Sequence, residues 1–288
     1  MRKLFVCIAL GLTTLTGNAA SPLWMRDVQI SPDGTEIAFC YKGDIYKVSA
    51  GGGTAIQLTT QPSYECTPIW SPDSKQIAFA SDRNGNFDIF VMPATGGTAQ
   101  RLTTHSSSEL PSAFTPDGKY ILFSASIQDP SQSALFPTTA MTELYKVPVN
   151  GGRTEQVLGT PAEAVCYAPS GEFFLYQDRK GFEDEWRKNH TSSITRDIWL
   201  YDTKTGKHTN LTNHAGEDRN PVLSPDGKSV YLLSERKGSF NVYSFPLDNA
   251  QDLKAVTSFK THPVRFLSMS HGGTLCYAYD GEIYTQKD

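Results

Sequence analysis

The sequence has few charged residues, no excess of basic residues and no long apolar run beyond its N-terminus. Charged residues make up 19% of 288 residues, and 26 Lys and Arg against 30 Asp and Glu give a formal net charge of −4. A chain without basic excess is not expected to bind nucleic acid, because it cannot neutralise a phosphate backbone. The 39% of hydrophobic residues, with 23 Gly and 17 Pro, exclude a disordered chain, a coiled coil and a multi-span membrane protein.

Cysteine is also scarce, since the chain has five and no Cys-x-x-Cys pair. Cys7 lies in the N-terminal apolar run, and each of the others lies in an apolar segment with the pattern of a strand. So few cysteines in a chain of this size do not form a disulfide framework. We therefore predict small, buried apolar side chains at Cys40, Cys66, Cys166 and Cys276.

The first twenty residues have the pattern of a secretory signal peptide. Two basic residues precede the apolar run Leu4–Leu12, and small residues follow it up to Ala20. Nine apolar residues are too few for a helix to cross the bilayer, which needs about 20. We therefore expect residues 1–20 to be cleaved and the mature chain, residues 21–288, to be periplasmic without an integral membrane segment.

One tetrapeptide recurs six times, and its copies start 40 to 56 residues apart. Proline presets its own backbone angle, aspartate can accept hydrogen bonds from the backbone that follows, and glycine accepts a positive φ, so each copy predicts a turn between strands. An internal period of this length is typical of a propeller rather than of two domains. The copies are Ser31-Pro-Asp-Gly34, Ser71-Pro-Asp-Ser74, Thr115-Pro-Asp-Gly118, Ala168-Pro-Ser-Gly171, Ser224-Pro-Asp-Gly227 and the divergent Ser270-His-Gly-Gly273.

The same series of strand patterns surrounds each turn. An alternating apolar segment follows it, a triplet such as Asp44-Ile-Tyr46 begins a third strand, and a pair such as Leu58-Thr59 marks a short fourth strand. Without helical periodicity, this predicts an all-β, six-bladed β-propeller of four-stranded antiparallel blades. A two-sheet sandwich is the alternative, but it does not require one strand order six times. The predicted blades begin near residues 24, 65, 109, 163, 218 and 264, and the last blade has only three predicted strands.

A propeller divides its loops between two faces, and acidic residues recur at one of them. The innermost strand of each blade lines the central channel, the Pro-Asp turns lie on one face, and the links between blades lie on the other. Two insertions, residues 126–142 and 179–195, extend this second face. Four or five positions before the residue that precedes the turn, four blades carry a carboxylate: Glu65, Glu109, Glu163 and Asp218.

We predict that these four carboxylates form a partial ring at the channel mouth, which attracts cationic groups or the amino terminus of a peptide. The alternative is that link residues are polar because they are solvated. The charged segment Gly181–His190 is a second candidate, which could cap the channel or dock a partner, and an ordinary solvated insertion is its alternative.

Residues for catalysis or cofactor binding are not apparent in the sequence. The six histidines have no metal-ligand spacing, and a Gly-x-Ser-x-Gly elbow is absent. The glycine pairs lie in turns between strands rather than before helices, so they do not predict phosphate binding. We therefore expect no catalytic residue, no cofactor and no metal site in this chain.

Part of the sequence resembles a known family. The Pro-Asp turns and Asp-Ile-Tyr triplets also occur in TolB and in prolyl-oligopeptidase-like propellers, so they are specific for the fold alone. The segment Asp178–Lys188, followed by Asp197–Asp202, and the opening Pro22–Asp27 are more specific. They resemble the N-terminal six-bladed propeller of exported, tricorn-like serine peptidases.

The resemblance implies a non-catalytic propeller that gates or filters peptides for an enzyme that hydrolyses oligopeptides. In that family a seven-bladed propeller, a PDZ module and catalytic domains follow, and the full-length enzyme can form a homo-oligomer. Because the sixth blade lacks a predicted fourth strand, we expect the chain to be a fragment. A stand-alone periplasmic binding or scaffold propeller of TolB type is the alternative, and the propeller of a prolyl-oligopeptidase-like enzyme is a third.

Overall fold

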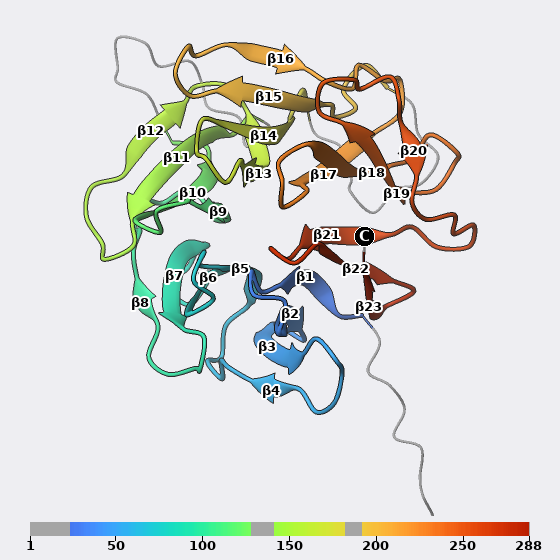
Figure 1. Ribbon diagram of the computed structural model, residues 1–288. Helices are drawn as coiled ribbons and strands as arrows, with labels where there is room; N and C mark the ends of the chain where they lie inside the picture. Colours follow the sequence, from blue (N-terminus) through green and yellow to red (C-terminus); the bar gives the residue numbers. More distant parts are fainter. Residues whose placement is uncertain (1–23, 128–140, 182–191, 288) are drawn as a thin grey trace, which may run out of the picture.

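The computed structural model describes residues 24–127, 141–181 and 192–287 (Figure 1). The predicted signal peptide and nearly all of the charged segment Gly181–His190 lie outside these residues. Strands β1 to β23 form six antiparallel sheets in a ring, and the described residues contain no helix. Five sheets have four strands and the last has three, which confirms the predicted six-bladed propeller.

Strand order follows the sequence in every blade, from the inner strand to the outer one. The strands of the first three blades are β1 Arg26–Ile30, β2 Glu36–Tyr41, β3 Asp44–Ser49, β4 Ile56–Gln57; β5 Glu65–Trp70, β6 Gln76–Ser81, β7 Asp88–Pro93, β8 Gln100–Arg101; β9 Glu109–Phe114, β10 Tyr120–Ala125, β11 Glu143–Pro148 and β12 Glu155–Leu158. Those of the last three are β13 Ala162–Tyr167, β14 Phe173–Asp178, β15 Ile198–Asp202, β16 His208–Asn210; β17 Asp218–Leu223, β18 Ser229–Ser234, β19 Asn241–Pro246, β20 Lys254–Ala255; β21 Arg265–Met269, β22 Thr274–Tyr279 and β23 Glu282–Lys287.

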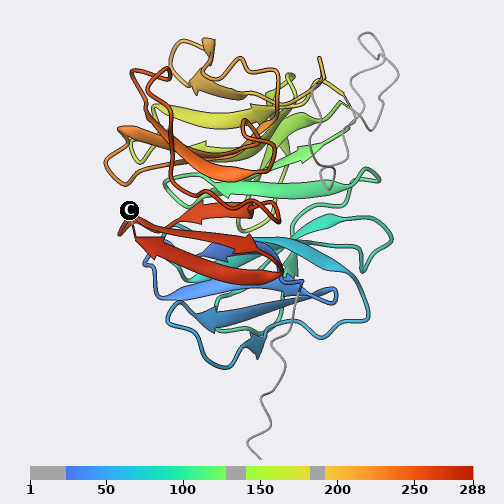
Figure 2. The same cartoon turned by 90° about the vertical axis from the view of Figure 1, so that its right-hand side faces the viewer.

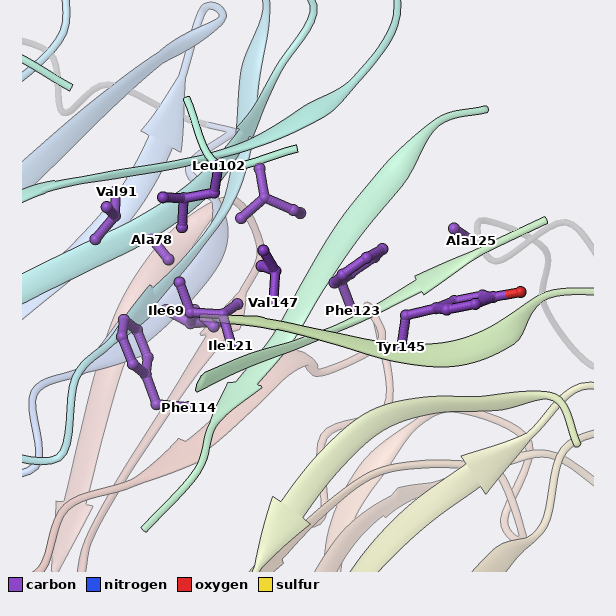
Figure 3. Packing of buried hydrophobic residues seen from close by; sticks show 11 residues of the cluster. Ile69, Ala78, Val91, Leu102, Phe114, Ile121, Phe123, Ala125, Tyr145 and Val147 are labelled. Atoms are coloured by element: carbon purple, nitrogen blue, oxygen red, sulfur yellow. The ribbon is translucent and has the colours of Figure 1, made fainter. Parts of the chain in front are cut away.

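The hydrophobic core consists of six clusters, each between two neighbouring blades. Figure 3 shows the cluster between blades two and three, where Ile69 and Ala78 face Phe114 and other side chains of the next blade. The aromatic rings of Phe123 and Tyr145 stack in this cluster with their centroids 5.8 Å apart. The alternating apolar residues of the second strand therefore pack against the aromatic residue of the Asp-Ile-Tyr triplets, and stacked blades bury both faces of each sheet.

Each inner strand contains a β-bulge near its middle. The register of β5 with β6 shifts between Cys66 and Ile69, and Thr67 between them has a φ of 49°. In β9 the equivalent residue is Pro111, whose ring excludes a positive φ, and the shift lies between Leu122 and Phe123 of the partner strand. The other inner strands carry a left-handed residue at this point: Asp27, Ala164, Asn220 and Phe266. The bulges turn backbone groups toward the neighbouring blade.

Blade six closes the ring against blade one through hydrogen bonds between their inner strands and turns. The backbone N–H groups of Trp24 and Met25 donate to the carbonyl of Gly281, at 3.0 and 3.3 Å. The N–H of Ile30 donates to Oγ of Ser268 at 3.1 Å. Figure 2 shows the strands of blade six, in red, beside those of blade one, in blue.

All four described cysteines are free thiols. Cys40 and Cys276 are buried, as predicted, while Cys66 and Cys166 are half-buried. Burial raises the pKa of Cys66 to about 12 and that of Cys166 to about 11. These thiols therefore stay protonated and unreactive near neutral pH.

Candidate functional site: the central channel and its charged inner strands

The central channel opens at the face of the Pro-Asp turns into a cavity of about 430 Å³. Every inner strand contributes to its wall, including the residue before each turn. None of the described lining residues is Asp, Glu, Lys or Arg. The residues before the turns that line the cavity are Ile30, Trp70, Phe114, Tyr167, Leu223 and Met269. The prolines of five turns also line it.

Hydrogen bonds between inner strands hold the wall of this cavity in place. Trp70 donates from Nε1 to the carbonyl of Gln29 in blade one, at 3.0 Å. The N–H of Val165 donates to Oγ of Ser112 in blade three, at 2.6 Å. Because both bonds join neighbouring blades beside the channel, the cavity is preformed.

The turns around this opening are stabilised by their aspartates. In the first turn, Asp33 accepts from the hydroxyl of Ser31 at 2.6 Å and from the N–H of Thr35 at 2.9 Å. These bonds lower the pKa of Asp33, and the bond from the Ser31 hydroxyl contributes most. The corresponding bonds lower the pKa of the equivalent carboxylates, Asp73, Asp117 and Asp226.

Three of the four predicted carboxylates occupy equivalent positions at the other end of the channel, but they are buried. Glu65, Glu109 and Asp218 are the first residues of β5, β9 and β17, and their exposed fractions are 0%, 1% and 0%. Glu163 is the second residue of β13, so it projects from the opposite face of its sheet. The structure therefore aligns three of these residues by blade, but it does not expose them as an open ring.

Arginines neutralise three of these carboxylates. Glu65 is paired with the guanidinium of Arg83, and Asp218 is paired with Arg236 at 2.8 Å. Glu163 accepts from Nη1 of Arg179 at 2.9 Å. Sequence reasoning missed these arginines, although their signal is present: Arg83 and Arg236 each follow the second strand of their blade by two residues, after Ser81 and Ser234.

Glu109 differs, because Ile127 stands where blade two has its arginine. Its Oε2 atom is buried and has no hydrogen-bond partner among the described residues. The nearby guanidinium of Arg101 pairs instead with Asp88, at 2.7 Å. Burial raises the pKa of Glu109 to about 7, against a hydrogen bond from Thr103 that lowers it.

A second group of buried charges joins blades four and five. Arg196 lies 2.8 Å from Oε1 of Glu217 and 3.5 Å from Oε2 of Glu163. Arg219 also pairs with Glu217, and these two guanidinium groups lower the pKa of Glu217 despite its burial. The sequence did not indicate this network, since Glu217 lies 21 residues from Arg196 beside the next blade and Glu163 lies 33 residues away in the same blade.

The described residues show no group of three His, Cys, Asp or Glu side chains arranged to hold a metal ion. In the same part of the chain, no helix is long and apolar enough to cross a bilayer.

A ring of six antiparallel blades around a preformed apolar cavity defines a six-bladed β-propeller with an axial channel. The chain belongs to the family of the tricorn protease N-terminal beta propeller domain, which it matches over residues 22–288. This match confirms the family expected from the segments that open the chain and surround residue 180.

Solved structures show the same fold. The tricorn protease superposes with a TM-score of 0.77 at 22% identity, over 92% of this chain and 25% of that chain. TolB from Acinetobacter baumannii superposes with a TM-score of 0.60 at 19% identity, over 89% of this chain and 64% of that chain. Identities this low support the fold alone.

Two curated relatives match over shorter stretches. An uncharacterized protein of Agrobacterium fabrum is 31% identical over 146 residues, which is 49% of this chain and 44% of the relative. An uncharacterized peptidase of Bacillus subtilis, YuxL, is 32% identical over 72 residues, which is 25% of this chain and 10% of the relative. The matches thus span less than half of either relative.

Proposed function

We propose that this chain is the non-catalytic, peptide-filtering propeller of a tricorn-like serine peptidase, exported to the periplasm after removal of residues 1–20. The observation that carries the proposal is the mostly apolar cavity of about 430 Å³ to which all six inner strands contribute. Family membership over residues 22–288 supports the link to such an enzyme. The chain corresponds to 25% of the tricorn protease chain, which supports further domains as its partners in a larger, oligomeric enzyme.

The cavity suits an extended peptide better than a charged metabolite. Apolar and aromatic side chains such as Tyr167 and Met269 offer contact surface without selecting one sequence, and the described lining contains no Lys or Arg to bind a phosphate or carboxylate. The hydrogen bonds between inner strands keep the opening at a constant width. A propeller of this kind admits unfolded chains and excludes folded ones.

Among the four predicted carboxylates, Glu109 is our candidate for contact with a cationic peptide group. Arginines within the chain already pair with Glu65, Glu163 and Asp218. Glu109 differs from them because its nearby arginine, Arg101, pairs with Asp88, so an ammonium or guanidinium group of a ligand would supply the missing opposite charge.

Binding of labelled, unstructured peptides to residues 21–288, followed by fluorescence anisotropy, tests this function. Replacing Ala113, which lines the cavity, by Trp should weaken peptide binding at least tenfold. The exposed Ala55→Trp variant adds the same side chain far from the channel and should bind as the wild type does. Equal affinity of both variants would refute a channel-based function and favour a TolB-like scaffold that binds through its outer surface.

A basic peptide extends the test to the carboxylate. Glu109→Gln should weaken binding of a peptide with an N-terminal lysine several-fold and leave binding of an acetylated, uncharged peptide unchanged. Equal loss for both peptides would exclude Glu109 as a contact for cationic groups.

A further inference from the structure

Blades one and two carry a long polar side chain beside the first residue of their Asp-Ile-Tyr triplet. A shared contact aligns these blades with others, because the second residue of the triplet, or its equivalent, donates its backbone N–H to a threonine hydroxyl at 2.9 Å. Two residues before this threonine, blade two has Arg101, which pairs with Asp88 at 2.7 Å. Blade one has Gln57, which donates to Asp44 at 3.0 Å. The aligned threonines are Thr59, Thr103, Thr212 and Thr257.

In blade five the residues at these two positions are Ala255 and Asn241. Ala255 pairs with Tyr243 in the register of β19 and β20, as Arg101 pairs with Phe90 in blade two, so the register of the strands supports the alignment. A methyl group therefore stands where blade two has a guanidinium. Ala255 and Asn241 both line a cavity of about 540 Å³ at the outer edge of blade five, beside β19 and β20 (Figure 1).

The amide of Asn241 holds one wall of this cavity in place. Its Nδ2 donates to the carbonyl of Phe259 at 2.9 Å, and its Oδ1 accepts from the N–H of Phe259 at 2.7 Å. An aspartate could not make the first bond, because an ionised carboxylate has no donor. The ring of Phe259 also stacks on that of Tyr279 in blade six, with the centroids 3.9 Å apart. The loop that follows β20 is therefore fixed from two sides, and the cavity is preformed.

Two lysines give this cavity a positive charge. Lys237 lies in the turn between β18 and β19, Lys260 lies in the loop after β20, and both are exposed. Neither lysine has an ion-pair partner among the described residues, and none of the described lining residues is Asp or Glu. Hydroxyl groups, among them those of Ser239 and Ser258, complete the polar lining. Because Asn241 is neutral, the aspartate that would repel an anion at this place in blade two is absent from blade five.

We propose that this cavity binds a small, hydroxylated phosphate monoester such as a sugar phosphate. A monoester carries about 1.5 to 2 negative charges near neutral pH and has three strong acceptor oxygens, which match the ammonium groups of Lys237 and Lys260. A volume of about 540 Å³ lies in the range of cavities that enclose organic ligands, so it admits more than the phosphate group. The hydroxyl groups of Ser239 and Ser258 then bond the hydroxyl groups of the ligand.

Isothermal titration calorimetry of the purified chain 21–288 with glucose 6-phosphate tests the proposal. We expect saturable binding at one site, which the double variant Lys237→Gln, Lys260→Gln weakens at least tenfold. Lys228→Gln removes an exposed lysine that follows the Pro-Asp turn of the same blade, and it should leave the affinity unchanged. An absence of binding by the wild type, or equal weakening by the double variant and Lys228→Gln, would overturn the proposal.

A second variant tests the cavity by filling it. Ala255→Arg combined with Asn241→Asp rebuilds in blade five the ion pair of blade two, and it should abolish binding of glucose 6-phosphate. Its melting temperature shows whether the blade still folds, and the lysine variants decide the question if it does not. Undiminished binding by the folded double variant would locate the ligand elsewhere and overturn the proposal.

Three further ligands test the chemistry of the site. Gluconate carries a carboxylate on a similar polyol, inorganic phosphate lacks the polyol and glucose lacks the anion, so each should bind at least tenfold more weakly than glucose 6-phosphate. Equal affinity for gluconate would overturn the assignment to a phosphate, and equal affinity for inorganic phosphate or glucose would overturn the assignment to a phosphate monoester. The cavity shares no lining residue with the channel, so these outcomes are independent of the proposed function.

Discussion

Arg196 of blade four lies 2.8 Å from the carboxylate of Glu217, immediately before the inner strand of blade five. Both side chains are buried, with exposed fractions of 7% and 0%. The pair therefore forms an ionic contact between two blades, at an interface that is otherwise held by apolar packing. Removing one partner of a buried ion pair destabilises a protein strongly, because the other charge remains in a low-dielectric site.

Replacing Arg196 by Met should lower the free energy of unfolding by about 3 kcal/mol, because the negative charges of Glu217 and Glu163 are then less fully neutralised. Urea denaturation of the mature chain measures this change. Lys204→Met removes an exposed pair with Glu172, at 2.5 Å, and should change the free energy of unfolding by less than about 1 kcal/mol. A similar effect of both variants would show that the buried network contributes nothing specific.

Glu109 should make the protein less stable as the pH rises toward 8. Burial raises its pKa to about 7, above the unfolded value of 4.5, so its contribution to stability is complete below pH 4.5 and is lost as the pH rises through 7. Glu109→Gln mimics the protonated form and should be more stable than the wild type at pH 8, on the order of 2 kcal/mol, with little difference at pH 5.

Thermal unfolding of both proteins across pH 5 to 8 measures this difference. The exposed Glu155→Gln variant is the matched control. Parallel curves for the wild type and Glu109→Gln would show that Glu109 does not take up a proton in this range.

Thr212→Val should destabilise blade four by about 1–2 kcal/mol, because it leaves the buried N–H of Ile198 without an acceptor. Thr209→Val makes the same change at an exposed position, in the neighbouring strand β16, and is the control. Chemical denaturation should separate the two variants. Faster hydrogen exchange at Ile198 in Thr212→Val alone would assign the loss to this bond.

Gly227→Ala should lower the free energy of unfolding by about 1 kcal/mol through backbone strain alone. Gly227 has a φ of 70°, and no atom lies within 4 Å of a Cβ placed there, so steric clashes do not contribute. Gly159 has no left-handed φ, and a Cβ placed there would lie 3.9 Å from Nε2 of Gln156, an ordinary contact, so Gly159→Ala should be neutral or slightly stabilising. If Gly227→Ala is also neutral, the turn relaxes to another conformation.

The sequence predicted the fold well because each blade repeats signals that act locally. The turn at Ser31–Gly34 and the alternation of Ile37 and Phe39 need only their own neighbours to form a hairpin, and six repeats of it leave few architectures. The three-stranded last blade was also predicted. The sequence located three of the candidate carboxylates at equivalent positions but did not predict their burial, and their role in peptide binding stays a prediction.

That burial depends on which side chains meet across blades and loops. Glu65 pairs with Arg83, 18 residues along the chain, while blade three has an isoleucine, Ile127, at the position equivalent to Arg83. A shift of one residue turns Glu163 to the other side of its sheet, where Arg179 and Arg196 approach it. Spacing in the sequence does not report such differences, because it does not give the direction of the side chain after a bulge.

The sequence by itself determined the blades, their turns and the family, since hydrogen bonding within a hairpin and apolar alternation are local properties. Only the tertiary structure decided which carboxylates pair with an arginine, and that a cavity without Asp, Glu, Lys or Arg in its described lining lies at the turn face. Those outcomes depend on closing the ring, because the channel and the interfaces between blades exist only when residues from all six units come together.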